Sequence, residues 1–278
     1  MGLSLSGWLG GIPAKMKKDA PSSSSFLPLS IPTSSRLSLL LNSSPVDPGD
    51  PRCRWSPTHC SPHFLLSQCG EEVTRAPTQQ ISDGARGEKG ERGGMHVWEV
   101  LWCPTHRGSH AVIGVSTEHC PLQTSGYTAL MGGDSQSWGW ELTNNQLWHA
   151  GQALGRYPGE RGVQAEEQSV SPPHPVPERV LLVLDADTGT LGYVVDDCFL
   201  GMAFKDLPQG VELFPAISSV RGGAFIRLRY LNGATREPPA LMALCGLSIH
   251  VSMGKERETQ TDRLPLPRPL QRYILPSM

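Results

Sequence analysis

The chain has 278 residues, of which 38% are hydrophobic, enough for one large domain or two modest ones with a packed core. Its 24 basic and 26 acidic residues nearly balance, so charge gives no reason to expect nucleic acid or an anionic membrane surface as a partner. No segment approaches the roughly 18 consecutive apolar residues of a membrane span, and the N-terminus lacks a secretion signal. We therefore expect a soluble, cytosolic protein.

Residues 1–54 form the first region, in which Ser and Pro dominate and neither a helical nor an alternating apolar period persists. Such a composition cannot bury enough apolar surface to offset the loss of conformational entropy on folding. It predicts a disordered leader.

Residues 55–233 form the second region, where short apolar runs alternate with turn signals. The runs are rich in aromatic and β-branched residues and lie at 96–102, 110–116, 137–142, 179–185, 190–195, 198–204, 212–220 and 224–231. This pattern predicts an all-β domain of antiparallel strands, most simply a sandwich. The turn at 185–190 predicts a hairpin, Trp138 and Trp140 are expected in the core, and the polar stretch 156–177 is expected to be an exposed loop.

Residues 234–278 form the third region, which begins with a short amphipathic helix. Leu241, Leu244, Cys245 and Ile249 recur at three-to-four spacing after a pair of prolines. A helix this short is unstable alone in water, so its apolar face needs a partner. The tail that follows, LPLPRPLQRYI at 264–274, is too apolar for a free terminus. Both C-terminal pieces are therefore expected to dock on the sandwich or on another protein.

The cysteines and histidines offer a candidate metal site. The chain has 7 cysteines without the spacing of a disulfide framework, which favours free thiols in a reducing compartment. His59, Cys60, His63 and Cys69 are zinc-ligand types close in sequence, but their spacing matches no recognised pair set. We expect ordinary side chains there, and neither a metal nor another cofactor.

A candidate nucleophile lies in the stretch GGDS, where Ser135 follows Asp134. This fragment is similar to the start of some serine-hydrolase motifs, and histidines elsewhere could complete a triad. It lacks the G-x-S-x-G elbow between a strand and a helix, so a turn before the run at 137–142 is the better interpretation.

Several stretches together resemble the SPRY-domain proteins that carry a SOCS box. HVWEVLW, RGSHAVIGVS, YTALMGGDSQSWGWEL, LLVLDADTGTLGYVVDDCFLGMAFKDL and RLRYLNG are similar, in order, to the strands of that family's SPRY sandwich. ALMALCGLSI followed by LPLPRPLQRYI is similar to its SOCS box. The resemblance runs from Trp55 nearly to the end of the chain, and two modules in the right order are far more specific than one.

The resemblance implies binding sites in both modules. In the SOCS box it assigns elongin C binding to Leu241, Leu244, Cys245 and Ile249, and cullin binding to Leu264, Pro265, Leu266, Pro267, Leu270 and Tyr273. In the SPRY domain it implies a site for an Asp/Glu-Ile-Asn-Asn-Asn peptide, made by Arg75, Pro77, Gln80, Tyr127, Leu130, Val220, Arg221 and Gly222. Three positions depart from the family: Arg221 replaces a tryptophan, Gln79 an alanine, and Thr261 an apolar residue near the cullin motif.

The implied function is substrate recognition for an elongin BC–cullin–RING ubiquitin ligase, with no catalytic residue in this chain. Its contribution would be proximity, because the sandwich holds a target while the SOCS box tethers it to the ligase and promotes ubiquitination and degradation. Thr261 keeps an alternative open, a peptide-binding adaptor that binds elongins B and C without recruiting a cullin. A hydrolase using Ser135 is the third hypothesis.

Overall fold

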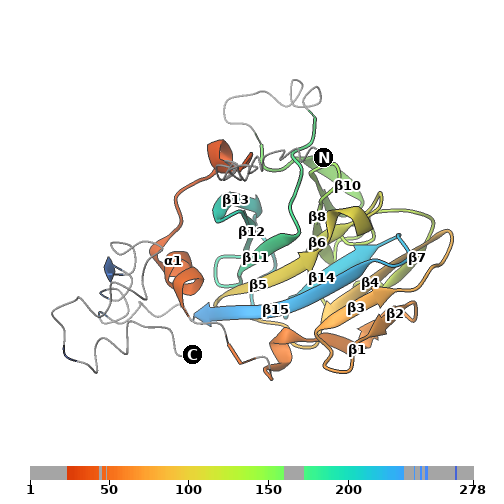
Figure 1. Cartoon of the computed structure of the whole chain (residues 1–278), viewed down its shortest axis with the longest axis horizontal. Coiled ribbons are helices and arrows are strands. Elements are labelled where there is room, and N and C mark those ends of the chain that lie inside the picture. Colours follow the sequence, from red (N-terminus) through yellow and green to blue (C-terminus); the bar gives the residue numbers. More distant parts are fainter. Residues whose placement is uncertain are drawn as a thin grey trace, which may run out of the picture.

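The computed structural model describes residues 24–43, 46–47, 49–159 and 172–234, and beyond them Leu241, Cys245, Ser248, Ile249 and Pro267. Within the long described ranges, two antiparallel sheets stack face to face, as Figure 1 shows. This is the mainly-β sandwich expected from the alternation of short apolar runs and turns.

The larger sheet has 8 strands, and its main path follows the order β1-β4-β14-β6-β8-β9-β10, with β7 pairing β4. Its strands are β1 (Trp55–Cys60), β4 (Ile81–Gly87), β6 (Val112–Ser116), β7 (Gln123–Ser125), β8 (Ser137–Glu141), β9 (Gln146–His149), β10 (Gln152–Arg156) and β14 (Phe214–Ser219). Because β4, β6 and β14 lie together at its centre, segments far apart in sequence meet at the ends of these strands.

The smaller sheet has 7 strands in the order β13-β12-β11-β5-β15-β3-β2. Its strands are β2 (Phe64–Leu66), β3 (Glu72–Arg75), β5 (Met95–Trp102), β11 (Arg179–Asp185), β12 (Thr190–Val195), β13 (Cys198–Phe204) and β15 (Phe225–Ala234). Short 3₁₀ turns η1 (Leu27–Leu29), η2 (Pro51–Cys53) and η3 (Pro104–His106) and one helix, α1 (Ser35–Asn42), complete the elements.

Each apolar run singled out in the sequence forms a strand, from β5 and β6 to β14 and β15. The predicted hairpin is confirmed, since β11 and β12 pair with Asp185 opposite Thr190. Asp185 Oδ1 accepts hydrogen bonds from the backbone of Asp187 and Thr188, and Gly189 takes a positive φ of 65° that glycine adopts without strain.

Large aromatic side chains fill the space between the sheets. Trp98, Trp102 and Trp140 are fully buried, and Trp138 belongs to the same apolar cluster, as predicted. The Tyr193 hydroxyl on β12 donates to the Ile113 carbonyl on β6, which ties one sheet to the other at 2.9 Å. Burial of this hydroxyl raises the pKa of Tyr193 well above its ordinary value, so it remains a donor.

The expectation that residues 1–54 are disordered is wrong for the described residues from Ser24 onward. Phe26 is fully buried in the main core, and helix α1 packs Leu37 and Leu40 against the outer face of the smaller sheet. Ser34 caps this helix by accepting a hydrogen bond from the Leu37 backbone at 3.2 Å. Arg36 adds an ion pair of 2.9 Å to Asp187, so a few apolar residues anchor a Ser/Pro-rich segment.

The polar stretch 156–177 also differs from the expected exposed loop, because both of its described ends are anchored. Tyr157 and Val176 are buried in the main core, and the Tyr157 hydroxyl donates to the Gly201 carbonyl at 2.8 Å. The composition of the stretch is polar overall, but one aromatic and one aliphatic residue fix where it leaves and rejoins the sandwich.

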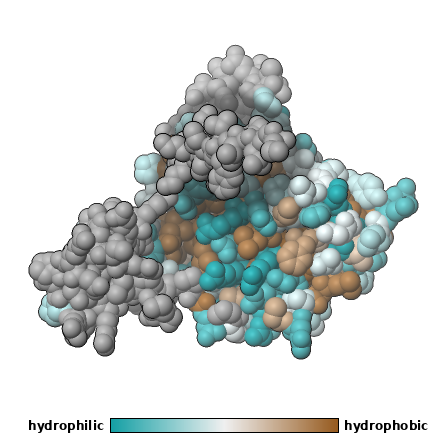
Figure 2. Space-filling model, viewed as in Figure 1, coloured by the Kyte–Doolittle hydropathy of each residue, from teal (hydrophilic) through white to brown (hydrophobic). Residues whose placement is uncertain are grey.

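The face of the molecule seen in Figure 2 mixes hydrophilic and apolar side chains over the sandwich. Apolar residues form separate groups among the hydrophilic ones, a pattern ordinary for a protein surface. Among the described residues, no helix has the length and apolar character needed to cross a membrane.

Candidate functional site

Most of the residues expected to bind a peptide come together on three loops at one end of the larger sheet. The loop after β3 carries Pro77 and Gln80, the loop after β7 carries Tyr127, and the β14–β15 loop carries Gly222. Gly222 lies so close to Pro77 that an added Cβ would approach the Pro77 Cα to 2.8 Å. The Gln80 carbonyl accepts a hydrogen bond from the Gly126 backbone at 2.8 Å, which places Tyr127 next to this group.

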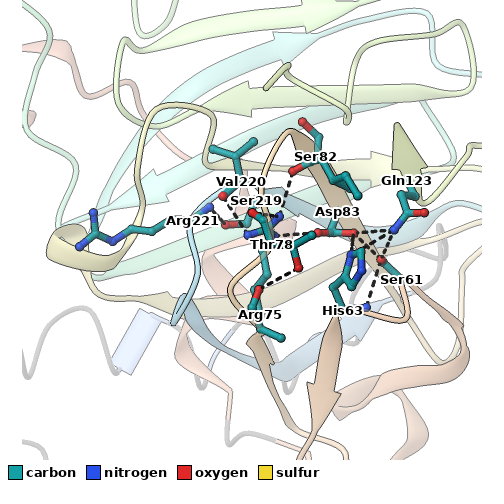
Figure 3. A network of polar contacts seen from close by, with 12 residues as sticks. Ser61, His63, Arg75, Thr78, Ser82, Asp83, Gln123, Ser219, Val220 and Arg221 are labelled. Atoms are coloured by element: carbon teal, nitrogen blue, oxygen red, sulfur yellow. Dashed lines mark hydrogen bonds and ion pairs between the residues drawn. The ribbon is translucent and has the colours of Figure 1, made fainter. Parts of the chain in front are cut away.

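Arg75 lies beneath these loops rather than on their surface. Its side chain is 0% exposed and forms an ion pair of 2.8 Å between Nε and Asp83 Oδ2. Its two terminal nitrogens donate to the carbonyl oxygens of Val220 and Ile81, each at 2.9 Å, and to Thr78 at 3.5 Å (Figure 3). The guanidinium therefore cannot touch a ligand in this conformation, and it instead fixes the loops above it.

Asp83 is the other half of this buried network and is also completely buried. Its Oδ1 accepts hydrogen bonds from Ser61 and from Gln123, the latter at 3.0 Å, and lies 2.9 Å from His63 Nδ1. Burial by itself raises the pKa of Asp83, but the hydrogen bonds of Gln123, Ser61 and His63 and the charge of Arg75 outweigh it, so the pKa is lowered. Asp83 is thus held as the carboxylate that Arg75 requires.

The Tyr127 loop is fixed from β4 by the hydroxyl of Ser82. This hydroxyl contacts the carbonyls of Gly126 and Thr128 at 2.9 and 3.0 Å and accepts a hydrogen bond from the Thr128 backbone at 2.9 Å. Tyr127 remains 49% exposed, whereas Leu130 is buried in a small cluster over the larger sheet. Of this loop's expected site residues, Tyr127 has an exposed side chain and Leu130 supports the loop from below.

Arg221 is exposed and points away from the buried network, as Figure 3 shows. Its stem lies against Gly108, where an added Cβ would approach the Arg221 Cβ to 2.9 Å. Among the described residues, no carboxylate lies within ion-pair distance of its guanidinium. The charge of Arg221 is therefore available at the rim of the loops, beside Val220 and Gly222.

A pocket of about 670 Å³ lies beside Tyr127. Its lining includes His110, Gln123, Tyr127, Leu130, Asp134 and Trp148. We refer to it as the Trp148 pocket. Sequence reasoning missed it, because its lining comes from β7, β9 and four loops, and no local pattern links them.

The residues that surround Arg75 in this network were also missed, and their sequence signal is weak. Asp83 sits in ISDGARG, a stretch with too many small and polar residues to be recognised as the central strand β4. Ser61 and His63 lie on the β1–β2 connection and Gln123 on β7, so only the fold brings them to Asp83 on β4. A buried carboxylate in a strand is informative only once its arginine is seen beside it.

The residues assigned to elongin C binding are only partly described. Leu241, Cys245 and Ile249 have helical backbone. The side chain of Leu241 is 76% exposed, and the free thiol of Cys245 is exposed as well. Both residue types are usually buried. Leu244 and the expected cullin residues Leu264, Pro265, Leu266, Leu270 and Tyr273 lie outside the described residues, while Pro267 is exposed. Leu241 and Cys245 are thus open to a partner.

Of the two other candidate sites, the GGDS stretch is accounted for by local structure. Asp134 Oδ1 accepts hydrogen bonds from the Gln136 backbone and the Ser137 hydroxyl, at 3.0 and 2.7 Å, which makes the GGDS stretch the turn that was predicted. Within the described ranges, His59, Cys60, His63 and Cys69 form no cluster that could hold a metal ion.

Comparison with known proteins shows which family contains this arrangement. A SPRY domain family matches residues 95–229, and a SOCS box family matches residues 237–275. Human SPRY domain-containing SOCS box protein 2 is 40% identical over 237 residues, which cover 85% of this chain and 88% of that protein. The chain belongs to the SPRY domain-containing SOCS box family.

Other members of the SPRY domain-containing SOCS box family are similarly related. SPRY domain-containing SOCS box protein 1 from Homo sapiens is 42% identical and covers 72% of this chain and 71% of its own length. Protein gustavus from Drosophila melanogaster is 38% identical and covers 72% of this chain and 70% of its own. A SPRY domain followed by a SOCS box indicates a substrate-recognition adaptor of a cullin-RING ubiquitin ligase in general.

Proposed function

We propose that this protein is a cytosolic substrate-recognition subunit that binds a short peptide on its targets through the SPRY loops and binds elongin C and a cullin through the SOCS box. The chain supplies no catalytic residue. It brings the target close to the ubiquitin-loaded components of the ligase, which raises the effective concentration of acceptor lysines. Ubiquitination would then direct the target to proteasomal degradation.

The exposure of Leu241 and Cys245 carries the ligase half of the proposal. A helix that presents a leucine and a small thiol one turn apart offers an apolar ridge to a partner's groove. We assign Leu241, Leu244, Cys245 and Ile249 to elongin C, which associates with elongin B. The proline-spaced residues from Leu264 to Tyr273 are assigned to the cullin, because prolines pre-set an extended backbone and lower the entropy lost on binding.

The rigid loop cluster carries the recognition half of the proposal. Pro77, Gln80, Tyr127, Val220 and Gly222 meet at one rim, and the fully paired Arg75–Asp83 network fixes the loops that carry them. An extended peptide needs backbone and amide hydrogen bonds together with an aromatic wall, which Gln80 and Tyr127 are suited to supply. We propose an Asp/Glu-Ile-Asn-Asn-Asn-like peptide as the ligand class.

Titration of the purified protein with an Asp-Ile-Asn-Asn-Asn peptide tests this ligand class. The comparison is between the native chain and Arg221→Trp, measured by calorimetry. A guanidinium in place of an indole at a binding hot spot costs well over about 1 kcal/mol, so the variant is expected to bind more tightly. Tight binding by the variant alone would assign the native protein a different peptide, and absence of binding by both would contradict the ligand class.

An adaptor that binds elongins without recruiting a cullin is the second candidate, and Thr261 favours it. Co-expression with elongins B and C, followed by pull-down with the cullin and its RING partner, separates the two candidates. Leu264→Ala with Pro265→Ala serves as the control, expected to lose the cullin and keep the elongins. If the native chain already behaves like this control, the elongin-only adaptor is the better description.

A further inference from the structure

The Trp148 pocket is continuous with the proposed peptide site and extends onto further elements. Tyr127 and Leu130 belong to both, whereas Gln123 comes from β7, Trp148 from β9, and Asp134 from the turn before β8. A peptide that crosses Tyr127 therefore has room for a further side chain in this pocket. The volume of about 670 Å³ exceeds what the longest amino-acid side chain needs.

The walls of this pocket are fixed relative to one another by backbone hydrogen bonds. The Ala150 backbone donates to the Asp134 carbonyl and the Gly151 backbone to the Gly132 carbonyl, each at 2.9 Å. These bonds tie the turn that carries Asp134 to the hairpin that carries Trp148. A pocket whose walls are already in place loses little entropy when a side chain enters.

Trp148 is held by a buried carboxylate behind it. Its indole Nε1 donates to Glu141 Oε2 at 3.0 Å, and Asn144 donates to Glu141 Oε1 at 3.0 Å. His110 Nδ1 lies 3.6 Å from the same carboxylate and completes this side of the pocket. With its one donor already bonded, the Trp148 ring has only its π surface left to offer a guest.

Asp134 gives the pocket its charge. Its Oδ1 accepts the turn bonds from Gln136 and Ser137, and among the described residues no basic side chain lies within ion-pair distance of it. Arg86 lies buried nearby, but its Nη1 donates to the Thr117 and Cys120 carbonyls. An aromatic wall beside a carboxylate is the environment that attracts a cationic side chain.

We infer that the Trp148 pocket is a second peptide subsite, which takes an arginine or lysine side chain flanking the segment bound at the SPRY loops. The inference rests on the proposed peptide capture and adds to it a position for a basic residue. The aliphatic stem of that residue packs between Tyr127 and Trp148, and its charged head reaches Asp134. The subsite selects among peptides that share the same central segment.

Selection from a random peptide library tests this without assuming the central sequence. The full chain with elongins B and C is compared with Asp134→Asn, which removes the charge and keeps an oxygen for the turn bonds. Native protein is expected to enrich peptides with Arg or Lys at one fixed offset, and Asp134→Asn to enrich the same central segment without it. Enriched peptides lacking any basic preference would overturn the subsite alone, whereas no enriched peptide at all would overturn peptide capture itself.

A selected peptide then provides a matched pair of ligands, one with arginine and one with its neutral isostere citrulline. We expect native protein to prefer the arginine form roughly tenfold and Asp134→Asn to show no preference. Glu118→Gln is the control, since it removes one charge from the exposed loop next to the pocket without touching its lining. Loss of the preference in that control would mean that long-range electrostatics, rather than the subsite, causes the preference for arginine.

A second measurement on native protein remains informative even if Asp134→Asn does not fold. The indole N–H resonance of Trp148 is followed by NMR as each peptide is added, because the charged head and stem of the guest would lie against this ring. A larger shift with the arginine peptide than with the citrulline peptide supports the subsite. Equal shifts, or none, would place the basic residue elsewhere.

Discussion

Charged side chains are usually exposed and apolar ones buried, and two regions of this protein depart from that rule. The Arg75–Asp83 network buries charge, whereas the C-terminal segment exposes Leu241 and Cys245. In the network, Arg75 and Asp83 are fully buried, and groups of the same chain supply their hydrogen-bond partners. In the C-terminal segment, an apolar side chain stands 76% exposed. The first region is complete within the fold, whereas the second offers a surface for another protein.

The two regions therefore contribute to different free energies, the network to folding and the C-terminal segment to association. A buried charge is tolerated only when its partners are fixed, so the network makes the loops above it rigid. An exposed leucine contributes little to the folded chain and contributes fully only when a partner covers it. Substitutions in the network should therefore change stability, and substitutions in the C-terminal segment should change association.

The largest effect is expected from Asp83→Asn, which leaves the buried charge of Arg75 without a counter-ion. Breaking one side of a buried pair costs about 3–5 kcal/mol in the free energy of unfolding. Urea unfolding of the native and variant chains measures this loss. Arg92→Ala is the control, since its pair with Glu212 is largely exposed and should cost at most about 1 kcal/mol. Equal losses in the two variants would contradict the comparison.

Acid should weaken the same network in the native protein. The pKa of folded Asp83 lies below its ordinary value of 3.8, so its stabilising contribution is present above that value and is lost as the pH falls through the folded pKa. The difference in unfolding free energy between native protein and Asp83→Asn is therefore expected to narrow below about pH 4. A difference that stays constant down to pH 2 would show that Asp83 is not the titrating group.

Leu241→Ala should weaken association without weakening the fold. Loss of a hot-spot leucine is expected to reduce elongin C affinity by about 2 kcal/mol, roughly 30-fold, while unfolding changes by less than ~0.5 kcal/mol. Leu65→Ala is a matched control, because Leu65 on β2 is also an exposed leucine, at 62%. Calorimetry with the elongin B and C complex gives the affinities. A similar loss in both variants would remove the special role of Leu241.

The smallest effect is expected at helix α1, where Ser34→Ala removes the capping hydroxyl. The loss of an N-cap costs about 1 kcal/mol, and here it should act on the docking of this helix more than on the sandwich. Hydrogen exchange of the α1 amides is expected to accelerate about fivefold, while the amides of β5 keep their protection. Faster exchange in β5 would mean that α1 and the sandwich unfold as one unit.

Much of the sandwich could be predicted from sequence, because a run such as 179–185 carries enough apolar residues to be recognised alone. Short strands such as β2 and β7 could not, since three residues hold no period. The leader was misjudged for a related reason. Phe26, Leu37 and Leu40 are too few to change the average composition of a Ser/Pro-rich segment. Each of them nevertheless packs on an apolar surface of the sandwich.

The residues of the candidate site could be predicted only where the resemblance to a family includes them. Pro77, Tyr127 and Gly222 meet at one rim, but resemblance could not show that Arg75 acts from below. That role depends on Asp83, a residue no motif marks. The Trp148 pocket was beyond sequence reasoning altogether, because Asp134 and Trp148 become neighbours through hydrogen bonds between a turn and a hairpin.

The docking of α1 on the smaller sheet bears on how this protein should be produced. A shortened version that begins at Trp55 would uncover the patch of Val97, Val183 and Val194 that Leu37 and Leu40 now cover, and would empty the place of Phe26. Bare aliphatic surface of this kind invites self-association and poor yield. Preparations intended for crystallisation or screening should retain every residue from Ser24 onward.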